Sequence, residues 1–329
     1  MPRAAQALAP RAGEPQGIGS EAYLNSTSQG PTPEDARKDA HIRGRSRQFV
    51  KYPGQGFLSG IGIYLIVMKQ ANLDYFKRWF KRYVAQYYEL PGDGIKPILL
   101  KEQHTERTCI EIILVGRKSG LSDEDLLLAE TAALFHDIGR FPQWKRYATF
   151  IDSASEDHAL LGLDVVSRYK ILAGIPPEKR ELICEAIRHH NLRELPTNLS
   201  QRQYLFSGLL RDADKLDIWG LVISELEGRG NLVETLAGYI PISNSFSRDI
   251  VAELLEGKVP DFSSVRNRND MILLRLGWVF DLNFTMSCRL VLERNYVERL
   301  CVHLPVRSEL QEVKEYLISY LKNRAKDTS

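Results

Sequence analysis

The chain has 329 residues, of which 43% are hydrophobic and 26% are charged, and its formal net charge at pH 7 is +2. This length and composition indicate a globular protein with one large core, or one core with an added lobe. The small net charge argues against nucleic acid or an anionic membrane surface as the main partner. The cysteines show no close spacing and no CxxC pair, so we expect reduced, packed thiols in a cytoplasmic protein. They are Cys109, Cys184, Cys288 and Cys301.

Residues 1–67 differ in composition from the rest of the chain. Residues 1–56 are rich in Pro, Gly, Ser, Gln and Arg without apolar periodicity, so we expect them to be disordered. The apolar stretch 57–68 has about 12 residues, well short of the roughly 20 that a membrane-spanning helix needs. Met68 would be a natural initiator of the compact part. Residues 1–67 are therefore interpreted as a disordered extension that is either dispensable or a start-site artefact.

From Met68 onward the sequence predicts one helix after another. Residues 68–90 place Leu73, Phe76 and Phe80 at helical spacing, which favours a core-packing helix over a nucleic-acid surface. Acid-rich starts and glycine or proline boundaries mark the later helices. These lie within residues 99–120, 121–139, 154–174, 176–191 and 201–226, with two or three more in 247–323. No segment alternates convincingly at period two, so the predicted fold class is all-α.

Most of the histidines lie on successive predicted helices, together with two aspartates. The gaps along this set are each about one helical hairpin long, so five helices can bring their side chains to one point. The set comprises His104, the adjacent His136 and Asp137, His158, the adjacent His189 and His190, and Asp214.

The residue types in this set suit a divalent transition metal. Neutral imidazoles and carboxylates bind first-row metals, and the absence of cysteine from the set argues against a closed structural zinc site. The second oxygen of Asp137 can bridge from one ion to another that is held by His158 and one histidine of the 189–190 pair. Two such ions lower the pKa of a bridging water and clamp a phosphoryl group. The ligands allow Mn, Fe, Co, Ni or Zn, as one ion or two.

The stretches HDIGR, which begins at His136, and RDADKLD, which begins at Arg211, resemble typical motifs of the HD domain superfamily of metal-dependent phosphohydrolases. The ordered set H…HD…H…HH…D resembles the two-metal members, which include cyclic-dinucleotide phosphodiesterases. The chain is also similar to bacterial HD proteins of unassigned substrate. The resemblance implies an HD-type helical bundle, with a metal-binding core over residues 68–225 and a C-terminal helical extension over 226–329 packed on it.

The same resemblance implies a role for each member of the set. The ligands of the first ion would be His104, His136, Asp137 and Asp214. The ligands of the second ion would be His158, His189 and His190, with Asp137 as the bridge. Asp214 is preferred to Asp212 as the ligand because it directly precedes Lys215 in a DxDK pattern. His190 points inward more securely than His189 in the predicted helix.

Charged residues around the set complete the predicted site. Arg140, Arg211 and Lys215 are expected to bind the substrate's phosphate oxygens. The residues expected to act in catalysis are Asp137, Arg140 and Lys215. Asp212 and Asp217 are expected to orient a ligand from outside the coordination sphere.

Together these expectations describe a metal-dependent phosphohydrolase in the cytoplasm. It would be a phosphatase or phosphodiesterase that acts on a nucleotide or another small phosphorylated compound through a metal-activated hydroxide. One alternative is a di-iron HD-type oxygenase that uses oxygen to cleave a C–H or C–P bond. Another is a metal-containing ligand sensor without turnover. The substrate, the native metal and the oligomeric state stay open at this point.

Overall fold

A computed structural model describes residues 67–90, 94–229 and 241–326, and every regular element within these ranges is a helix. The predicted all-α fold class is therefore confirmed. The predictions made for residues 1–66 lie outside the described residues. No helix among the described residues is long and apolar enough to cross a membrane.

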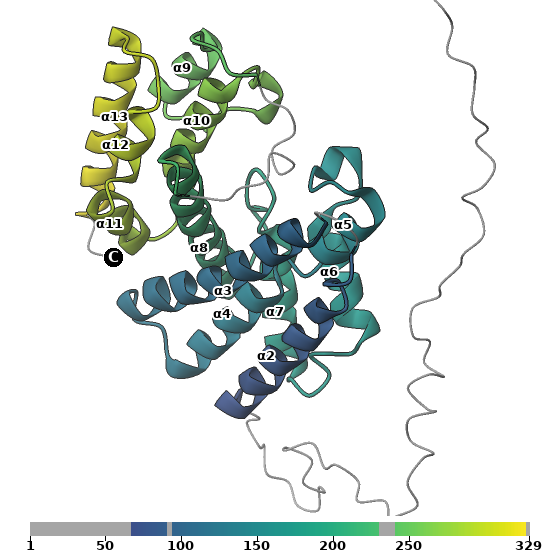
Figure 1. Cartoon of the computed structure of the whole chain (residues 1–329). Coiled ribbons are helices and arrows are strands. Elements are labelled where there is room, and N and C mark those ends of the chain that lie inside the picture. Colours follow the sequence, from purple (N-terminus) through teal and green to yellow (C-terminus); the bar gives the residue numbers. More distant parts are fainter. Residues whose placement is uncertain (1–66, 91–93, 230–240, 327–329) are drawn as a thin grey trace, which may run out of the picture. The chain divides into compact units, whose positions relative to one another are not determined.

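The helix α3 (Ile95–Lys118) is the central element of the first half. It packs against α4 (Asp123–Phe135) and α8 (Gln201–Leu226), while α2 (Gln70–Ala85) covers α4 (Figure 1). The buried face of α2 confirms the aromatic spacing read from the sequence. Its members are Leu73, Phe76, Phe80, Tyr83 and Val84.

The helix α4 is built to lie inside the protein. The Ser122 hydroxyl accepts a hydrogen bond from the Asp125 amide at 3.2 Å, and three acidic residues occupy the first turn. An N-cap and early carboxylates stabilise a helix start because they satisfy free amides and complement the helix dipole. From Leu128 to Phe135 apolar side chains on every face are buried. A helix that is apolar all round belongs in a core, so α4 delivers its last residues to the protein interior.

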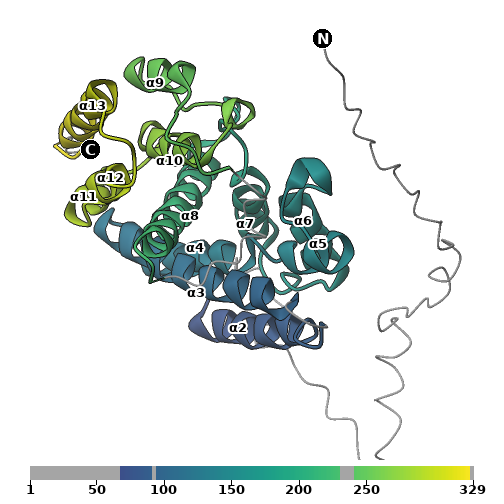
Figure 2. The same ribbon diagram turned by 45° about the horizontal axis from the view of Figure 1, so that its top comes forward.

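Three short helices follow α4 and lie beside one another in Figure 2. They are α5 (Arg140–Tyr147), α6 (His158–Arg168) and α7 (Pro177–His189), with the 3-10 turn η2 (Asp152–Ala154) between α5 and α6. The sequence placed the end of α6 near Gly174, but the helix stops at Arg168. Lys170 adopts a left-handed φ of 51°, which a helix cannot continue through.

The C-terminal part contains more helices than the two or three predicted. It comprises α9 (Arg248–Leu255), η4 (Phe262–Ser264), α10 (Arg268–Gly277), η5 (Trp278–Asp281), α11 (Thr285–Glu293), α12 (Tyr296–Cys301) and α13 (Ser308–Arg324). Part of the excess arises because one apolar run is divided. Asn295, at a left-handed φ of 52°, separates α11 from α12.

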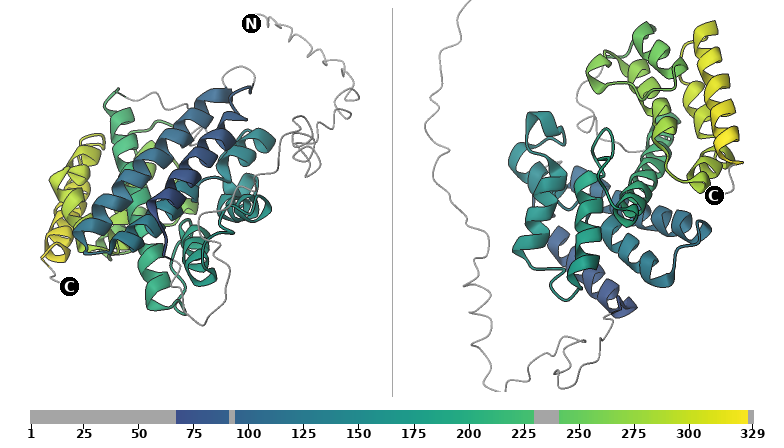
Figure 3. Two further views of the ribbon diagram at one scale, coloured as in Figure 1. Left: turned by 90° about the horizontal axis from the view of Figure 1, so that it is seen from below. Right: turned by 180° about the vertical axis from the view of Figure 1, so that it is seen from behind.

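These C-terminal helices pack on α3 and α8, which carry His104 and Asp214. The helix α11 contacts α3 and α8, and α12 contacts α8 (Figure 3). Arg294 forms a two-pronged ion pair with Glu111 of α3, at 2.9 and 3.0 Å. Trp278 and Tyr296 pack on Trp219 of α8, with ring centroids 6.0 and 6.2 Å away. The division into a core over 68–225 and an extension over 226–329 stays a prediction.

Candidate metal centre

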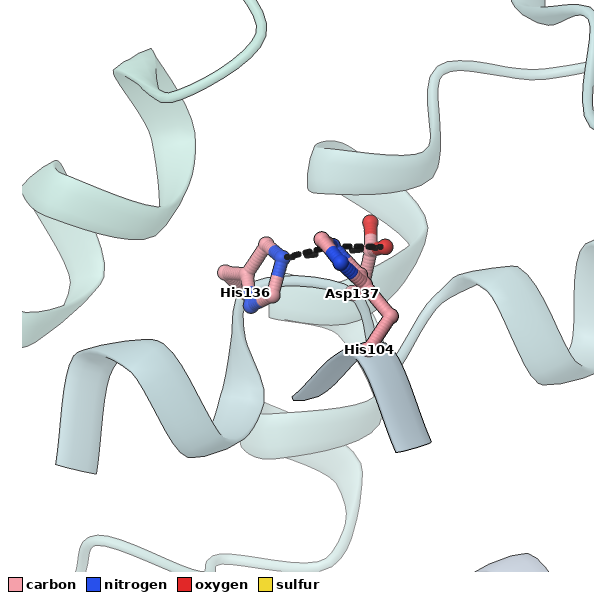
Figure 4. Close-up of side chains that lie close together, drawn as sticks. All are labelled: His104, His136 and Asp137. Carbon is pink, nitrogen blue, oxygen red and sulfur yellow. Dashed lines mark hydrogen bonds and ion pairs between the residues drawn. The ribbon is translucent and has the colours of Figure 1, made fainter. Parts of the chain in front are cut away.

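Six of the predicted ligands meet in the interior, and five helices or helix ends bring them there. His104 lies in the middle of α3, His136 and Asp137 follow the end of α4, and His158 is the first residue of α6. The other two are His190, which follows the end of α7, and Asp214 in α8. Figure 4 shows His104, His136 and Asp137 side by side.

The first group of ligand atoms is the Nε2 atoms of His104 and His136 with two carboxylate oxygens. The two nitrogens are 3.2 Å apart. Asp137 Oδ2 lies 3.5 and 3.6 Å from them, and Asp214 Oδ1 lies 3.0 and 3.6 Å from them. Ligand atoms at about 2.1 Å from a common ion lie roughly 3.0 to 3.5 Å from one another. The two nitrogens and Asp137 Oδ2 therefore lie close enough to hold one ion, and Asp214 Oδ1 lies beside both nitrogens.

The second group uses the other oxygen of the same aspartate. Asp137 Oδ1 lies 3.4 Å from His158 Nε2 and 3.9 Å from His190 Nε2, and the two nitrogens are 2.9 Å apart. The two groups, His104–His136–Asp137 and Asp137–His158–His190, are both close enough to hold a metal ion. Asp137 thus presents one oxygen to each group, which is the geometry of a bridging carboxylate.

All four histidines have the same orientation, with Nε2 turned inward and Nδ1 bonded to an acceptor. His136 and His190 reach the carbonyl oxygens of Ala133 and Ile187, each at 2.7 Å. His104 and His158 reach carboxylates, Asp217 and Asp152, each at 2.6 Å. An acceptor at Nδ1 holds a proton there, so Nε2 is the nitrogen that each ring offers to a metal.

The site concentrates negative charge on its carboxylates. Burial opposes ionisation of Asp137, but Lys101, His136, Arg140 and His158 outweigh it and hold the pKa of Asp137 well below its usual value. Burial likewise opposes ionisation of Asp214, and hydrogen bonds from His104 and His136 hold its pKa well below the usual value. Both side chains are therefore charged at neutral pH.

Three of the clustered histidines have shifted pKa values, and the direction of the shift differs between the two groups. Burial and Lys101 oppose protonation of His104, but the carboxylates of Asp214 and Asp217 outweigh them and raise its pKa to about 9. Burial and Arg140 lower the pKa of His158. Burial, with His158 and His136 nearby, lowers the pKa of His190 well below the usual value. The group around Asp137 Oδ1 therefore consists of neutral imidazoles, the form that binds metals.

Two cations contact the shared carboxylate. Arg140 Nε lies 3.4 Å from Asp137 Oδ1, and its Nη1 donates to Gln143, the Phe150 carbonyl and Asp152. Lys101 Nζ lies 2.7 Å from Asp137 Oδ2. The sequence analysis singled out Arg140 but not Lys101. Lys101 lies three residues before His104, on the same helix face, and that spacing could have identified it.

Arg211 and Lys215 are engaged with the C-terminal part of the protein. Both pair with Asp281, at 2.5 and 2.7 Å, and both side chains are buried. Arg211 also donates to the carbonyl oxygens of His189 and His190, at 3.1 and 3.3 Å. These contacts favour a role in holding the end of α7 over the predicted contact with substrate.

The remaining predicted residues lie around the centre. His189 turns toward Glu185, with Nε2 3.5 Å from its carboxylate, and not toward the ligand cluster. Asp217 is hydrogen-bonded to Nδ1 of His104, as described above. The sequence analysis gave Asp212 the same kind of role, and here the structure differs. The Asp212 carboxylate accepts hydrogen bonds from the amides of Asn283 and Phe284, at 2.9 Å each, and so fastens the C-terminal segment to α8.

The fold and the site together define an all-α protein with a buried histidine–carboxylate centre that could hold divalent metal. Residues 102–219 match the family model for the HD domain, and this range contains all six clustered side chains. Over these residues the chain is thus similar to the HD domain, a family whose members are generally metal-dependent hydrolases. No curated protein and no solved structure gave a significant match to the chain.

Proposed function

We propose that the protein is a metal-dependent phosphohydrolase whose centre holds two divalent transition-metal ions. The proposal depends above all on Asp137, whose two oxygens face two separate sets of imidazole nitrogens. Mn, Fe, Co, Ni and Zn all accept this mixture of imidazole and carboxylate ligands. Bound there, the ions would supply a nucleophilic hydroxide at neutral pH and neutralise charge on a phosphoryl group.

The chain's own residues would then have distinct tasks. His104, His136 and Asp214 would hold one ion, and His158 and His190 the other, with Asp137 between them. The orientation of the four histidines is fixed before an ion binds, because each Nδ1 is bonded to a backbone carbonyl or a carboxylate. Such preorganisation lowers the free energy spent on rearranging ligands when an ion binds.

The surroundings of the centre favour an anionic substrate. Lys101 and Arg140 both lie beside the bridging carboxylate, and both stack near the Phe150 ring, at 5.6 and 5.7 Å from its centroid. Cations in this position would stabilise the charge that develops on phosphate oxygens in the transition state. A nucleotide or another small phosphorylated compound is the substrate class that we propose.

Metal analysis combined with a substrate panel tests this function. The protein would be purified anaerobically, its metal content measured, and phosphate release followed from phosphomonoesters, phosphodiesters and nucleotides. We expect about two ions per chain and turnover that is lost in His136→Ala and Asp137→Ala. Unchanged metal content in both variants would mean that the centre is assigned wrongly.

The same sample separates the two alternative functions. Oxygen consumption with a mixed-valence iron signal, and no phosphate release, would indicate a di-iron oxygenase. Tight ligand binding without turnover under any divalent metal would indicate a sensor.

A further inference from the structure

We propose that Lys101 is an exchangeable counter-ion of the metal centre, which competes with the first ion for Asp137 and binds the phosphoryl group of the substrate once the ion has taken that carboxylate. The second half of this proposal rests on the proposed phosphohydrolase function. The first half concerns metal binding alone.

The competition follows from the contacts of a single oxygen atom. Lys101 Nζ lies 2.7 Å from Asp137 Oδ2, and the same oxygen lies 3.5 and 3.6 Å from the Nε2 atoms of His104 and His136. It is therefore both the acceptor of the Lys101 ammonium and a ligand atom of the first group. A divalent ion at Oδ2 would repel an ammonium at this distance, because like charges repel strongly at a partly buried site.

Lys101 is better placed to move than the other cation at this carboxylate. The Arg140 guanidinium is fixed by Gln143, the Phe150 carbonyl and Asp152. Lys101 contacts Asp137 and the face of the Phe150 ring. A lysine ammonium is a compact charge on a flexible four-carbon stem, so it can turn from one anion to another without disturbing the backbone.

Solvent exposure places Lys101 where a substrate would enter. The side chains of His104, His136 and Asp137 are at most 3% exposed, whereas Lys101 is 16% exposed. Asp214, which lies beside the two histidines of the first group, is 17% exposed. The first group is therefore accessible to solvent at Lys101 as well as at Asp214, and an anion that approaches along Lys101 meets its ammonium.

The ligand that fits this position is a phosphoryl group with free non-bridging oxygens. One oxygen can face the ion while another accepts from the ammonium, which would be a charge-assisted hydrogen bond. Lys101 would then contact the substrate directly. Its ammonium would stabilise the negative charge on the phosphoryl oxygens in the ground state and in the transition state.

The test measures metal binding and phosphate binding separately on the full chain. Chelator-treated Lys101→Met is titrated with Mn²⁺, and free Mn²⁺ is counted by electron paramagnetic resonance. The Mn²⁺-loaded protein is then titrated with inorganic phosphate by calorimetry. Lys118→Met is the matched control, because it makes the same substitution on the same helix at an exposed position. Thermal unfolding of each variant checks that it folds.

We expect the two affinities to change in opposite directions in Lys101→Met. Mn²⁺ should bind roughly tenfold more tightly, because a competing charge is gone. Phosphate should bind roughly tenfold or more weakly, because a charge-assisted hydrogen bond is lost. Lys101→Arg keeps the charge, so it should restore most of the phosphate affinity, and Lys118→Met should change neither affinity.

Each outcome decides one half of the proposal. Mn²⁺ affinity that falls or stays the same in Lys101→Met would overturn the counter-ion role. Tighter Mn²⁺ binding with unchanged phosphate affinity would overturn the substrate role. If the unmodified protein binds Mn²⁺ but neither binds phosphate nor releases it from any ester, the proposed function is wrong, while the metal titration still decides the counter-ion role.

Discussion

The Asp217 carboxylate accepts a hydrogen bond from Nδ1 of His104 at 2.6 Å, one turn along α8 from Asp214. Arg107, on the helix that carries His104, holds the same carboxylate with two contacts at 2.6 and 3.1 Å. An imidazole fixed in this way can present only Nε2 to an ion, and the carboxylate makes that nitrogen more basic. We therefore propose that Asp217 is a positioning residue for the first group of ligands.

Replacing Asp217 should weaken metal binding without removing a ligand. In Asp217→Ala, His104 loses the acceptor at Nδ1, so its tautomer and ring orientation are no longer fixed. We expect roughly 10- to 100-fold weaker Mn²⁺ binding at the first group, as for other partners of metal-bound histidines. Titration with Mn²⁺ measures this directly. Asp164→Ala, which removes an exposed carboxylate paired with Arg168, is the control. Equal affinities in the two variants would argue against the positioning role.

The two neighbouring histidines after α7 should behave differently. His190 Nε2 lies 2.9 Å from His158 Nε2, whereas His189 turns toward Glu185. We expect His190→Ala to retain one ion per chain in place of two, and His189→Ala to retain both. Elemental analysis of the purified variants measures the stoichiometry. Loss of an ion from His189→Ala alone would reverse the assignment within this pair.

Much of the candidate centre could be predicted because its residues carry their signal in the sequence. His136 and Asp137 end an apolar helix, where uncompensated polar groups are costly. His104 and His158 lie about one helical hairpin to either side of them. In an all-α protein such spacing returns the chain to the same end of the bundle. The order of the helices alone therefore predicts that these side chains meet. The structure does bring these side chains together.

What the sequence did not reveal depends on contacts between distant residues. Asp281 meets Arg211 across 70 positions, and nothing near either residue in the sequence indicates the other. Lys101 resembles any surface lysine until Asp137 is placed beside it. The ends of α6 and α11 are followed by Lys170 and Asn295, whose left-handed backbone angles ordinary residues adopt only when packing requires them. The partners of these side chains and the ends of these helices are determined by tertiary structure and not by the local sequence.

Gly139 allows the turn that places Asp137 beside His158. A Cβ atom at Gly139 would lie 2.1 Å from the His158 carbonyl oxygen and 2.5 Å from the Gly162 amide nitrogen, which are backbone atoms that cannot move aside cheaply. We expect Gly139→Ala to lower the free energy of unfolding by about 3 kcal/mol or more, since overpacking against backbone is costly. Urea unfolding measures it. Gly174→Ala, where a Cβ meets nothing within 4 Å, is the control. A stability equal to that of the control would contradict this account of the turn.

Asp281 connects the C-terminal helices to the end of α7. It pairs with Arg211 and Lys215, whose side chains are only 2% and 9% exposed. Arg211 in turn donates to the carbonyl oxygens of His189 and His190, and so holds the backbone next to a proposed ligand of the second ion. Asp281 therefore connects the C-terminal part of the chain to the backbone beside the candidate metal centre.

Asp281→Ala should affect both stability and the second ion. Removing the shared partner leaves two buried cations without their carboxylate, so we expect the free energy of unfolding to fall by about 3 to 5 kcal/mol. Because Arg211 is then less firmly placed, the second ion should be lost before the first during stepwise chelation. Urea unfolding and metal counting measure the two effects. Glu256→Ala, which breaks an exposed pair with Lys258, should change neither. A destabilised Asp281→Ala that releases both ions together would show that Asp281 supports the fold but not the second group in particular.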